Sequence, residues 1–269
     1  MALIRIENLT MHYESRPILS QLALEIQEGE FVCLLGQTGC GKSTLLRLVL
    51  GAERPTSGRI LIDGDEHQRP DRSRGYVPQK YSLFPDRTVL DNITFGCELS
   101  EFSLWKRYTP RFYRRRRELR AQAVEYLRRV GLTEADAKKY PDQLSGGMQQ
   151  RVAIAQALMT KPRILLMDEA FSALDPATRE DMQRWIRELW RETGTTILFV
   201  THHTQEALRM GTRIVVLAKE SPDQGSCVRL DLPVPDPCQE EDVPRLVRRL
   251  ESESRPRMAV EGGVAQPVA

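Results

Sequence analysis

The residues of this chain best suited to chemistry form a glycine-rich turn that ends in a lysine and two hydroxyl side chains. They match the phosphate-binding pattern of Gly, four residues, Gly, Lys and Ser or Thr, and run in the order Gly36, Gln37, Thr38, Gly39, Cys40, Gly41, Lys42, Ser43 and Thr44. An apolar run over residues 31–35 precedes the turn and an apolar-periodic run over residues 45–50 follows it, which predicts a strand, a turn and a helix. The glycines let successive backbone N–H groups point at one anion, and the helix N-terminus adds the positive end of its dipole. We therefore predict a nucleotide site, with Lys42 on the β- and γ-phosphates and Ser43 on Mg²⁺, in preference to a turn that only joins a strand to a helix.

Two acids, Asp168 and Glu169, end another strongly apolar run at residues 163–169. The run predicts a buried parallel strand, and acids at the carboxyl end of such a strand lie in the ligand crevice. Adjacent strand residues point in opposite directions, so Asp168 is expected to face Mg²⁺ and Glu169 the γ-phosphate. A metal ligand beside a general base for water suits hydrolysis. The alternative, a solvated pair, fits poorly with the apolar residues that precede it.

Three more side chains follow predicted strands or lie in loops between them. Gln79 comes directly after a proline at a strand end, where it could bind Mg²⁺, orient water, or be an ordinary solvated residue. His202 follows the apolar strand 195–200 and is a candidate contact for the γ-phosphate, although a lone histidine is more often structural. Tyr13 is either a turn aromatic packed on a β layer or a flat surface for an adenine ring.

A second anion cradle lies far along the chain from the first. Ser145, Gly146 and Gly147 form a turn directly before the apolar helix predicted over residues 148–158. One nucleotide bound within one subunit cannot easily reach both cradles. This arrangement suggests a nucleotide shared between two copies.

Composition places the chain among soluble globular proteins and excludes several other classes. Its 269 residues are 41% hydrophobic and 28% charged, and the net charge of +2 identifies no partner. The N-terminus has no signal-peptide pattern, and no apolar run approaches the roughly 20 residues that a membrane helix needs. The five cysteines include no Cys-x-x-Cys pair, which argues against a disulfide framework or zinc site and favours a reducing cytoplasm.

The elements that must position these residues begin with two alternating strands, 3–7 and 22–26, joined by a polar loop and expected to form an antiparallel layer. Residues 88–162 read as helices, with Thr88 or Asp91 as the first cap. Within them, residues 106–120 are strongly basic and interleaved with aromatic residues. Such a stretch is most often a solvated helix face. A membrane-proximal role is the second interpretation, and nucleic-acid binding the third.

Together these motifs resemble those of ABC-transporter ATPases in identity and order. The motifs are the turn 36–44, Gln79, Leu144-Ser145-Gly146-Gly147-Met148-Gln149, the run 164–169, the loop Ser172–Asp175 and His202. The resemblance covers residues 3–218, and its Leu-Ser-Gly-Gly signature is highly specific. It implies an α/β fold: a P-loop NTPase core with a parallel sheet, an antiparallel β subdomain and an α-helical signature subdomain. We expect an ABC ATPase domain over residues 1–218 with its helical subdomain near 88–160, a C-terminal extension over 219–251 and a disordered tail over 252–269.

The resemblance also implies how the motifs are used. Two ATPase subunits, identical or paralogous, pair head to tail, and each ATP with its Mg²⁺ lies between the phosphate-binding turn of one and Ser145, Gly146 and Gly147 of the other. The other implied roles are adenine stacking by Tyr13, phosphate binding by Lys42, Mg²⁺ coordination by Ser43, Asp168 and Gln79, polarisation of the attacking water by Glu169, γ-phosphate contact by His202 and communication across the pair by Asp175.

Within that family the chain looks like the importer ATPases that serve nitrate, sulfonate and taurine uptake. The features that carry this likeness are the signature form Leu-Ser-Gly-Gly-Met-Gln-Gln-Arg, the segment 83–93 and a late strand at 228–233. Such a subunit docks on a membrane permease at the cytoplasmic face, and a solute-binding protein supplies the permease. Two alternatives are a non-transport ATPase that acts on nucleic acid or ribosomes and a nucleotide sensor without turnover; the resemblance makes nucleic acid the weaker partner.

Overall fold

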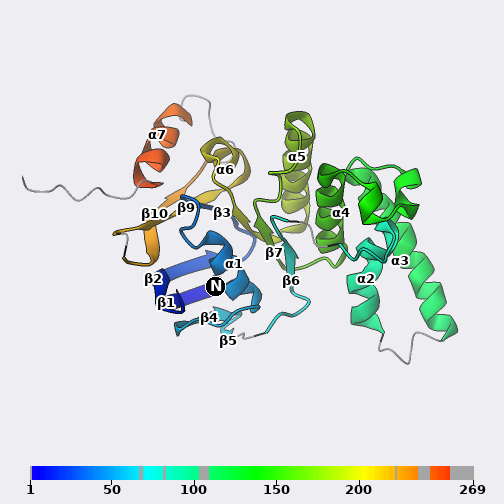
Figure 1. Ribbon diagram of the computed structural model, residues 1–269, viewed down its shortest axis with the longest axis horizontal. Helices are drawn as coiled ribbons and strands as arrows, with labels where there is room; N and C mark the ends of the chain where they lie inside the picture. The colour runs from blue at the N-terminus through cyan, green and yellow to red at the C-terminus, as the bar shows by residue number, and fades with distance from the viewer. Residues whose placement is uncertain are drawn as a thin grey trace, which may run out of the picture.

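Five largely buried strands form the parallel part of the sheet and carry the predicted site residues at their ends (Figure 1). The computed structural model describes residues 2–66, 69–80, 83–102, 109–221, 223–235 and 243–254. The parallel strands lie side by side in the order β9 (Arg213–Lys219), β3 (Phe31–Leu35), β8 (Thr196–Val200), β7 (Ile164–Asp168) and β6 (Arg74–Val77). Every residue of β3, β7 and β8 is buried, as is typical of strands covered on both faces. Because these strands are parallel, their carboxyl ends meet at one edge.

The predicted antiparallel layer is present and continues the same sheet. Its strands are β1 (Ala2–Tyr13), β2 (Arg16–Gln27), β4 (Ser57–Ile62), β5 (Asp65–Glu66) and β10 (Ser226–Pro233). The prediction of a polar loop between the first two strands is wrong, because both strands continue to the turn at Glu14 and Ser15. Asn8 and Gln21 have positive φ angles of 48° and 46°, and the pairing shifts register between Ile6 and Leu9. These irregularities break the alternation by which a strand is recognised in sequence.

Helices surround the sheet and form a separate lobe beside β6 (Figure 1). The helices α1 (Lys42–Leu50), α5 (Pro176–Thr193) and α6 (Thr204–Met210) each follow a parallel strand. The lobe consists of α2 (Val89–Glu101), α3 (Pro110–Arg129), the 3₁₀ helices η2 (Glu134–Lys138) and η3 (Pro141–Gln143), and α4 (Gly146–Met159). Thr88 caps α2 as predicted, since its hydroxyl accepts a hydrogen bond from the Asp91 amide at 3.2 Å.

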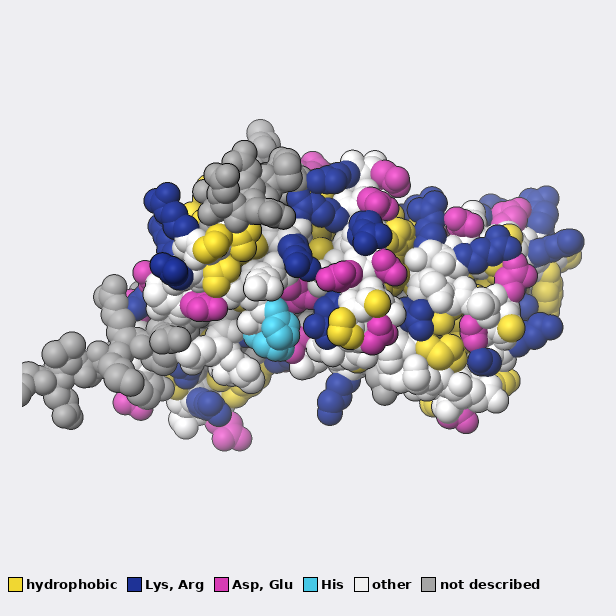
Figure 2. Space-filling model, turned by 90° about the horizontal axis from the view of Figure 1, so that it is seen from above, with side chains coloured by type: hydrophobic (Ala, Val, Ile, Leu, Met, Phe, Trp, Pro, Cys, Tyr) yellow, Lys and Arg dark blue, Asp and Glu magenta, His cyan; other side chains and the backbone are white. Residues whose placement is uncertain are grey.

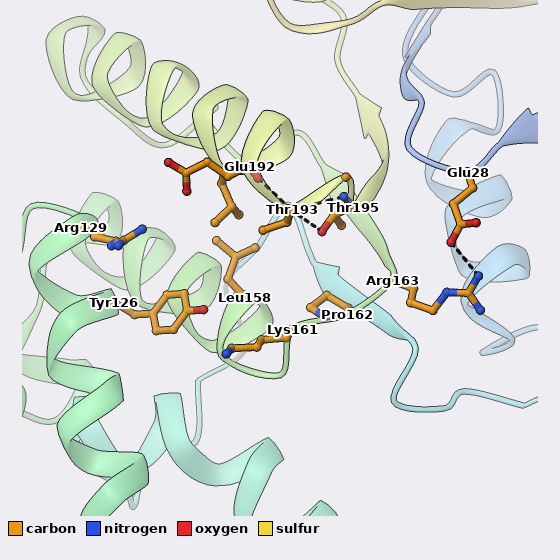
Figure 3. Close-up of a pocket in the computed structure, with 12 residues that line it drawn as sticks. Glu28, Tyr126, Arg129, Leu158, Lys161, Pro162, Arg163, Glu192, Thr193 and Thr195 are labelled. Carbon is orange, nitrogen blue, oxygen red and sulfur yellow. Dashed lines mark hydrogen bonds and ion pairs between the residues drawn. The ribbon is translucent and has the colours of Figure 1, made fainter.

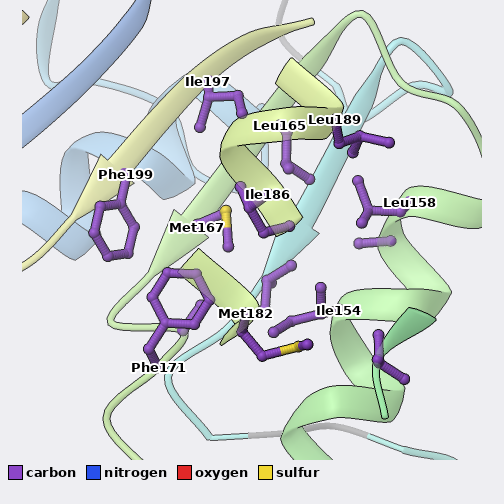
Figure 4. Packing of buried hydrophobic residues seen from close by; sticks show 14 of the residues in the cluster. Ile154, Leu158, Leu165, Met167, Phe171, Met182, Ile186, Leu189, Ile197 and Phe199 are labelled. Atoms are coloured by element: carbon purple, nitrogen blue, oxygen red, sulfur yellow. The ribbon is translucent and has the colours of Figure 1, made fainter. Parts of the chain in front are cut away.

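Buried side chains of α4 and α5 pack against β7 on one face of the sheet. Figure 4 shows Leu165 and Met167 of β7 against Met182 and Ile186 of α5, with Ile154 of α4 beside them. None of these side chains is more than 4% exposed. Since such interiors are close-packed, the end of β7 has little freedom to move relative to α4 and α5. This packing holds Asp168 and Glu169 in place.

The C-terminal extension consists of β10 and α7 (Val243–Ser254), which packs on α6 and β9. Leu250 of α7 is fully buried, and Glu253 pairs with Arg229 of β10 at 3.4 Å. The boundary predicted at residue 252 is therefore wrong by three residues, and residues 255–269 of the predicted tail lie outside the described residues. No helix in the described part of the chain is long and apolar enough to cross a membrane.

Candidate active site

The phosphate-binding turn has the predicted strand–turn–helix context, between β3 and α1. A Cβ atom at Gly36 would lie 2.3 Å from the Leu217 carbonyl oxygen and 2.8 Å from Cys40 Sγ, so no larger residue fits there without moving backbone. Gly41 precedes α1 in the left-handed region, with φ of 93°. These two glycines set the path of the turn, which leaves Gln37, Thr38 and Gly39 exposed where an anion can approach.

Lys42 is held across this turn. Its Nζ atom donates hydrogen bonds to the carbonyl oxygens of Gly36 at 2.7 Å and Gln37 at 2.9 Å, and the residue is only 5% exposed. The ammonium group is thus fixed beside the turn rather than free in solvent. Burial raises the pKa of the neighbouring Cys40 thiol, which is 5% exposed, and so favours its neutral, less nucleophilic form.

Ser43 and Asp168 form a pair of oxygen donors at the end of β7. Ser43 Oγ donates to Asp168 Oδ1 at 2.9 Å, and the Tyr76 hydroxyl lies 3.5 Å from Asp168 Oδ2. Burial, aided by the charge of Glu169, raises the pKa of Asp168 despite the hydrogen bond from Ser43. A buried carboxylate beside a hydroxyl is a hard-oxygen donor set of the kind that Mg²⁺ prefers, and a bound dication would offset the burial penalty. The residues present therefore fit the predicted metal.

Glu169 lies between Gln79, which the sequence predicted as a Mg²⁺ ligand, and His202. Its Oε2 accepts from Gln79 Nε2 at 2.9 Å, and its Oε1 lies 3.1 Å from His202 Nδ1. Glu169 has a φ angle of 44°, a conformation that is costly for a side chain of this size and concentrated at functional sites. Gln79 contacts Glu169 here, and within the described residues no hydrogen bond joins it to Ser43 or Asp168.

A hollow of about 380 Å³ joins His202 to the phosphate-binding turn. Its walls include Gly36, Gln37, Thr38, His202 and Glu251 of α7. The hollow brings the turn and the histidine to one opening, at the carboxyl edge of the parallel strands, and Glu169 is connected to it through His202. The contribution of α7 to this hollow was not predicted from the sequence.

Tyr13 stands at the end of β1 with its ring 39% exposed. Its hydroxyl donates to Glu53 Oε2 and accepts from Arg47 Nη2 at 3.0 Å, and the same Arg47 nitrogen lies 3.2 Å from Thr44 Oγ1. The ring is therefore tied to α1, the helix that begins at Lys42. Neither Arg47 nor Glu53 was among the predicted site residues.

Replacing Tyr13 by alanine should weaken ATP binding about tenfold, because stacking of a base on an aromatic ring contributes roughly 1–3 kcal/mol. Tyr13→Phe keeps the ring and loses only the hydroxyl contacts, and is expected to bind within about threefold of the parent. Equilibrium titration with a fluorescent ATP analogue measures both variants. Equal binding by Tyr13→Ala and the parent would show that adenine does not stack there.

The second predicted cradle is well formed but lies apart from the first. Ser145 is exposed and caps α4, accepting a hydrogen bond from the Met148 amide at 3.3 Å. A Cβ at Gly147 would lie 3.3 Å from the Ala173 carbonyl oxygen, so this turn packs against the loop that leads to Asp175. Figure 1 shows α1 and α4 well separated, with β6 and β7 between them. One chain thus holds two candidate anion cradles that lie apart from each other.

A family model described as ABC transporter matches residues 19–172 of this sequence, more than half of the chain. The chain belongs to the ABC transporter family. An uncharacterized ABC transporter ATP-binding protein of Methanocaldococcus jannaschii is 41% identical over 236 residues, which cover 86% of this chain and 84% of that protein. The family-level resemblance is confirmed, and with it the ATPase class and the ABC ATPase fold.

Two import proteins and a solved cassette are also similar to this ABC ATPase. The sulfate/thiosulfate import ATP-binding protein CysA of Mesorhizobium japonicum is 43% identical over 80% of this chain, and the spermidine/putrescine import ATP-binding protein PotA of Shigella dysenteriae is 43% identical over 80%. The chain spans 61% and 54% of their respective lengths. A dimeric ATP-binding cassette in a post-hydrolysis state with ADP and Pi superposes with a TM-score of 0.74 at 31% identity, covering 86% of this chain and 99% of that one.

Gln150 connects α4 to the loop that follows β6, a contact that the sequence did not reveal. The residue is fully buried in α4, and its Nε2 donates to the Pro78 carbonyl oxygen at 3.2 Å, directly before Gln79. Its Oε1 is buried without a hydrogen-bond partner among the described residues. A single amide thus links the helix of the Ser145 turn to the loop that places Gln79 on Glu169.

We expect Gln150→Met to lower ATP turnover about tenfold while ATP binding is unchanged, because the variant fills the same space but releases Pro78 and so misplaces Gln79. Gln149→Met is the matched control, since among the described residues the hydrogen bond of Gln149 Nε2 goes to Leu144 O at 3.1 Å, within its own turn. Steady-state ATPase assays with parallel nucleotide titrations separate the two effects. A Gln149→Met defect as large as that of Gln150→Met would contradict the role assigned to Gln150.

A larger hollow of about 580 Å³ lies elsewhere and contains none of the predicted site residues (Figure 3). Tyr126, Arg129, Leu158, Lys161 and Thr193 are among its lining residues, from α3, α5 and the end of α4. Its lining carries both positive and negative side chains, and the described lining residues include no glycine-rich turn and no metal-binding pair. The smaller hollow at the phosphate-binding turn is therefore the candidate site.

Proposed function

We propose that this chain is the ATP-hydrolysing subunit of a membrane importer and works as a head-to-tail pair. The observation that supports this most directly is the separation of the two cradles within one chain. Ser145, Gly146 and Gly147 are shaped to bind an anion, yet they lie away from the chain's own phosphate-binding turn. A second ATPase subunit, a copy or a paralogue, brings its own Ser145 turn to this site and receives the same in return.

In this proposal each side chain has a separate task. The turn 36–44 and Lys42 hold the triphosphate, and Tyr13 carries the adenine. Ser43 and Asp168 are the proposed ligands of Mg²⁺, with Gln79 joining them when ATP is bound. The metal, when bound, neutralises charge on the β- and γ-phosphates.

Glu169 orients and deprotonates the attacking water in this scheme, and His202 contacts the γ-phosphate from the other side of Glu169. The partner's Ser145 turn completes the site only when the two subunits meet, so hydrolysis requires pairing. Asp175, which caps α5 by accepting from the Thr178 amide at 3.0 Å, stands beside the Ser145 turn and is proposed to report pairing to the opposite site.

The proposed partners are permease subunits in the membrane, with the ATPase at the cytoplasmic face, and indirectly a solute-binding protein. The names of the relatives support import as the direction of transport. For the solute we propose a small anion: nitrate, sulfonate or taurine from the sequence features, and sulfate or thiosulfate from the CysA relative. PotA, named for spermidine and putrescine, has the same 43% sequence identity to this chain as CysA, so the solute is decided by a direct test.

That test starts from the full complex. A tagged chain purified from detergent-solubilised native membranes is expected to bring down membrane-spanning subunits in fixed ratio. After reconstitution with the binding protein, ATP hydrolysis is measured against a panel of nitrate, sulfate, thiosulfate, taurine and spermidine. Stimulation by one of the anions supports the proposal, stimulation by spermidine alone overturns the solute class, and purification without any membrane subunit overturns the importer.

A further inference from the structure

The arginines of the N-terminal half of α3 fall into two sets with different surroundings. The first set is paired with acids of α2: the Arg115–Glu101 and Arg116–Glu98 pairs are 2.8 and 3.0 Å long, and Arg120 contacts Asp91 at 2.5 Å. These pairs hold α3 against α2, which gives a structural role in the lobe to three of the six arginines that the structure describes in the basic stretch.

The second set faces away from the lobe. Arg111, Arg114 and Arg117 are exposed, and in the described part of the chain no carboxylate forms an ion pair with any of them. Steps of three residues place these arginines along one side of the helix. Tyr113 is 60% exposed and lies one helical turn before Arg117, with its ring edge-to-face against Phe112 at 5.7 Å. We call these four residues, Arg111, Tyr113, Arg114 and Arg117, the cationic face.

This face is a local concentration of charge on a chain whose net charge is only +2. Figure 2 shows Lys and Arg side chains gathered at the end of the molecule where Figure 1 places α2 and α3. The guanidinium groups follow one straight helix rather than surrounding a cavity. A row of exposed cations suits a flat array of phosphate groups, and an amphipathic tyrosine beside them suits a membrane–water interface.

We propose that the cationic face docks on anionic phospholipid headgroups around the permease. This inference rests on the proposed function, because that function places the chain beside a membrane. Each basic residue near an anionic leaflet strengthens attachment about fivefold, so three together contribute roughly a hundredfold. Lipid contact would hold the α2–α3 end of the subunit against the membrane while the permease engages it.

The experiment uses the full chain, without permease, and sedimentation with phosphatidylcholine vesicles that contain or lack phosphatidylglycerol. We expect the parent to bind only the anionic vesicles and to be released as salt is raised. The triple variant Arg111→Gln, Arg114→Gln, Arg117→Gln should bind roughly a hundredfold more weakly, and the single variant Arg114→Glu about tenfold more weakly. The matched control removes the same charge from α7, where Arg245, Arg248 and Arg249 are also exposed, and should bind within about twofold of the parent.

Several outcomes would overturn the proposal: no binding by the parent, equal binding to neutral vesicles, parent-like binding by the triple variant, or an equal loss in the α7 control. Displacement of the vesicles by a single-stranded oligonucleotide at lower concentration than by soluble phosphatidylglycerol would make the face a nucleic-acid surface instead. ATP hydrolysis by the triple variant in vesicle-free solution should equal that of the parent, which also shows that the variant is folded. Loss of vesicle binding with normal hydrolysis therefore tests the face alone, while failure of the parent to hydrolyse ATP would count against the proposed function.

Discussion

Glu169→Gln is expected to lower ATP hydrolysis by about a thousandfold, because it removes the group proposed to take a proton from the attacking water. The substituted amide has nearly the same shape and its oxygen can still accept from Gln79, so the fold and the nucleotide site should survive. ATP would then be bound without being hydrolysed, and the paired state should accumulate. Steady-state ATPase assays measure the first effect, and size-exclusion chromatography with ATP and Mg²⁺ measures the second.

Glu125→Gln is a suitable control for that experiment, since Glu125 is exposed and, in the described part of the chain, its ion pair is with Arg129 on the same helix. It should leave both hydrolysis and pairing at the parent level. If Glu169→Gln hydrolyses ATP at a normal rate, Glu169 is not the base, and His202, which lies 3.1 Å from it, becomes the group to test.

Ser145→Asp is expected to lower hydrolysis at least a hundredfold while leaving ATP binding to the isolated chain intact. Aspartate caps a helix as well as serine does, so α4 should remain folded. In a pair, however, the carboxylate would face the γ-phosphate bound by the partner, and the repulsion would prevent closure. ATP binding is measured by titration at dilution, and hydrolysis at concentrations where the parent pairs.

Ser145→Thr keeps both the cap and the hydroxyl and should retain activity within about threefold of the parent. Loss of ATP binding by Ser145→Asp at high dilution would place the Ser145 turn at its own subunit's nucleotide. That outcome would contradict the two-copy arrangement, because the variant should affect only the partner's site.

The residues proposed to act on the nucleotide were easier to predict from the sequence than the contacts that hold them in place. Lys42, Asp168 and Glu169 were identified from local sequence alone, because a phosphate-binding turn and a strand-end acid pair are recognised within a few residues. The contacts of Gln150 with Pro78 and of Tyr13 with Arg47 join segments distant in sequence. Spacing along one element carries no information about such contacts, so the sequence could not reveal them.

The same reason explains what the sequence left open in the fold. The strands β3, β7 and β8 are short apolar runs and were predicted, whereas the irregular pairing near Asn8 and Gln21 made half of β1 and half of β2 read as a loop. For α3 the sequence favoured a solvated basic helix face. Which of its arginines pair depends on Asp91, Glu98 and Glu101 of α2, and only the packing of two helices decides that.

Mixing two inactive variants tests the central claim most directly, that each nucleotide is enclosed by two chains. Lys42→Met loses the phosphate-binding lysine and Ser145→Asp loses the opposing cradle, so each alone should be inactive. In a mixed pair, the phosphate-binding turn of the Ser145→Asp chain faces the intact Ser145 of the Lys42→Met chain. An equal mixture should recover about a quarter of the parent ATPase rate, because half of randomly formed pairs are mixed and each holds one complete site. A mixture as inactive as its two components would contradict the account.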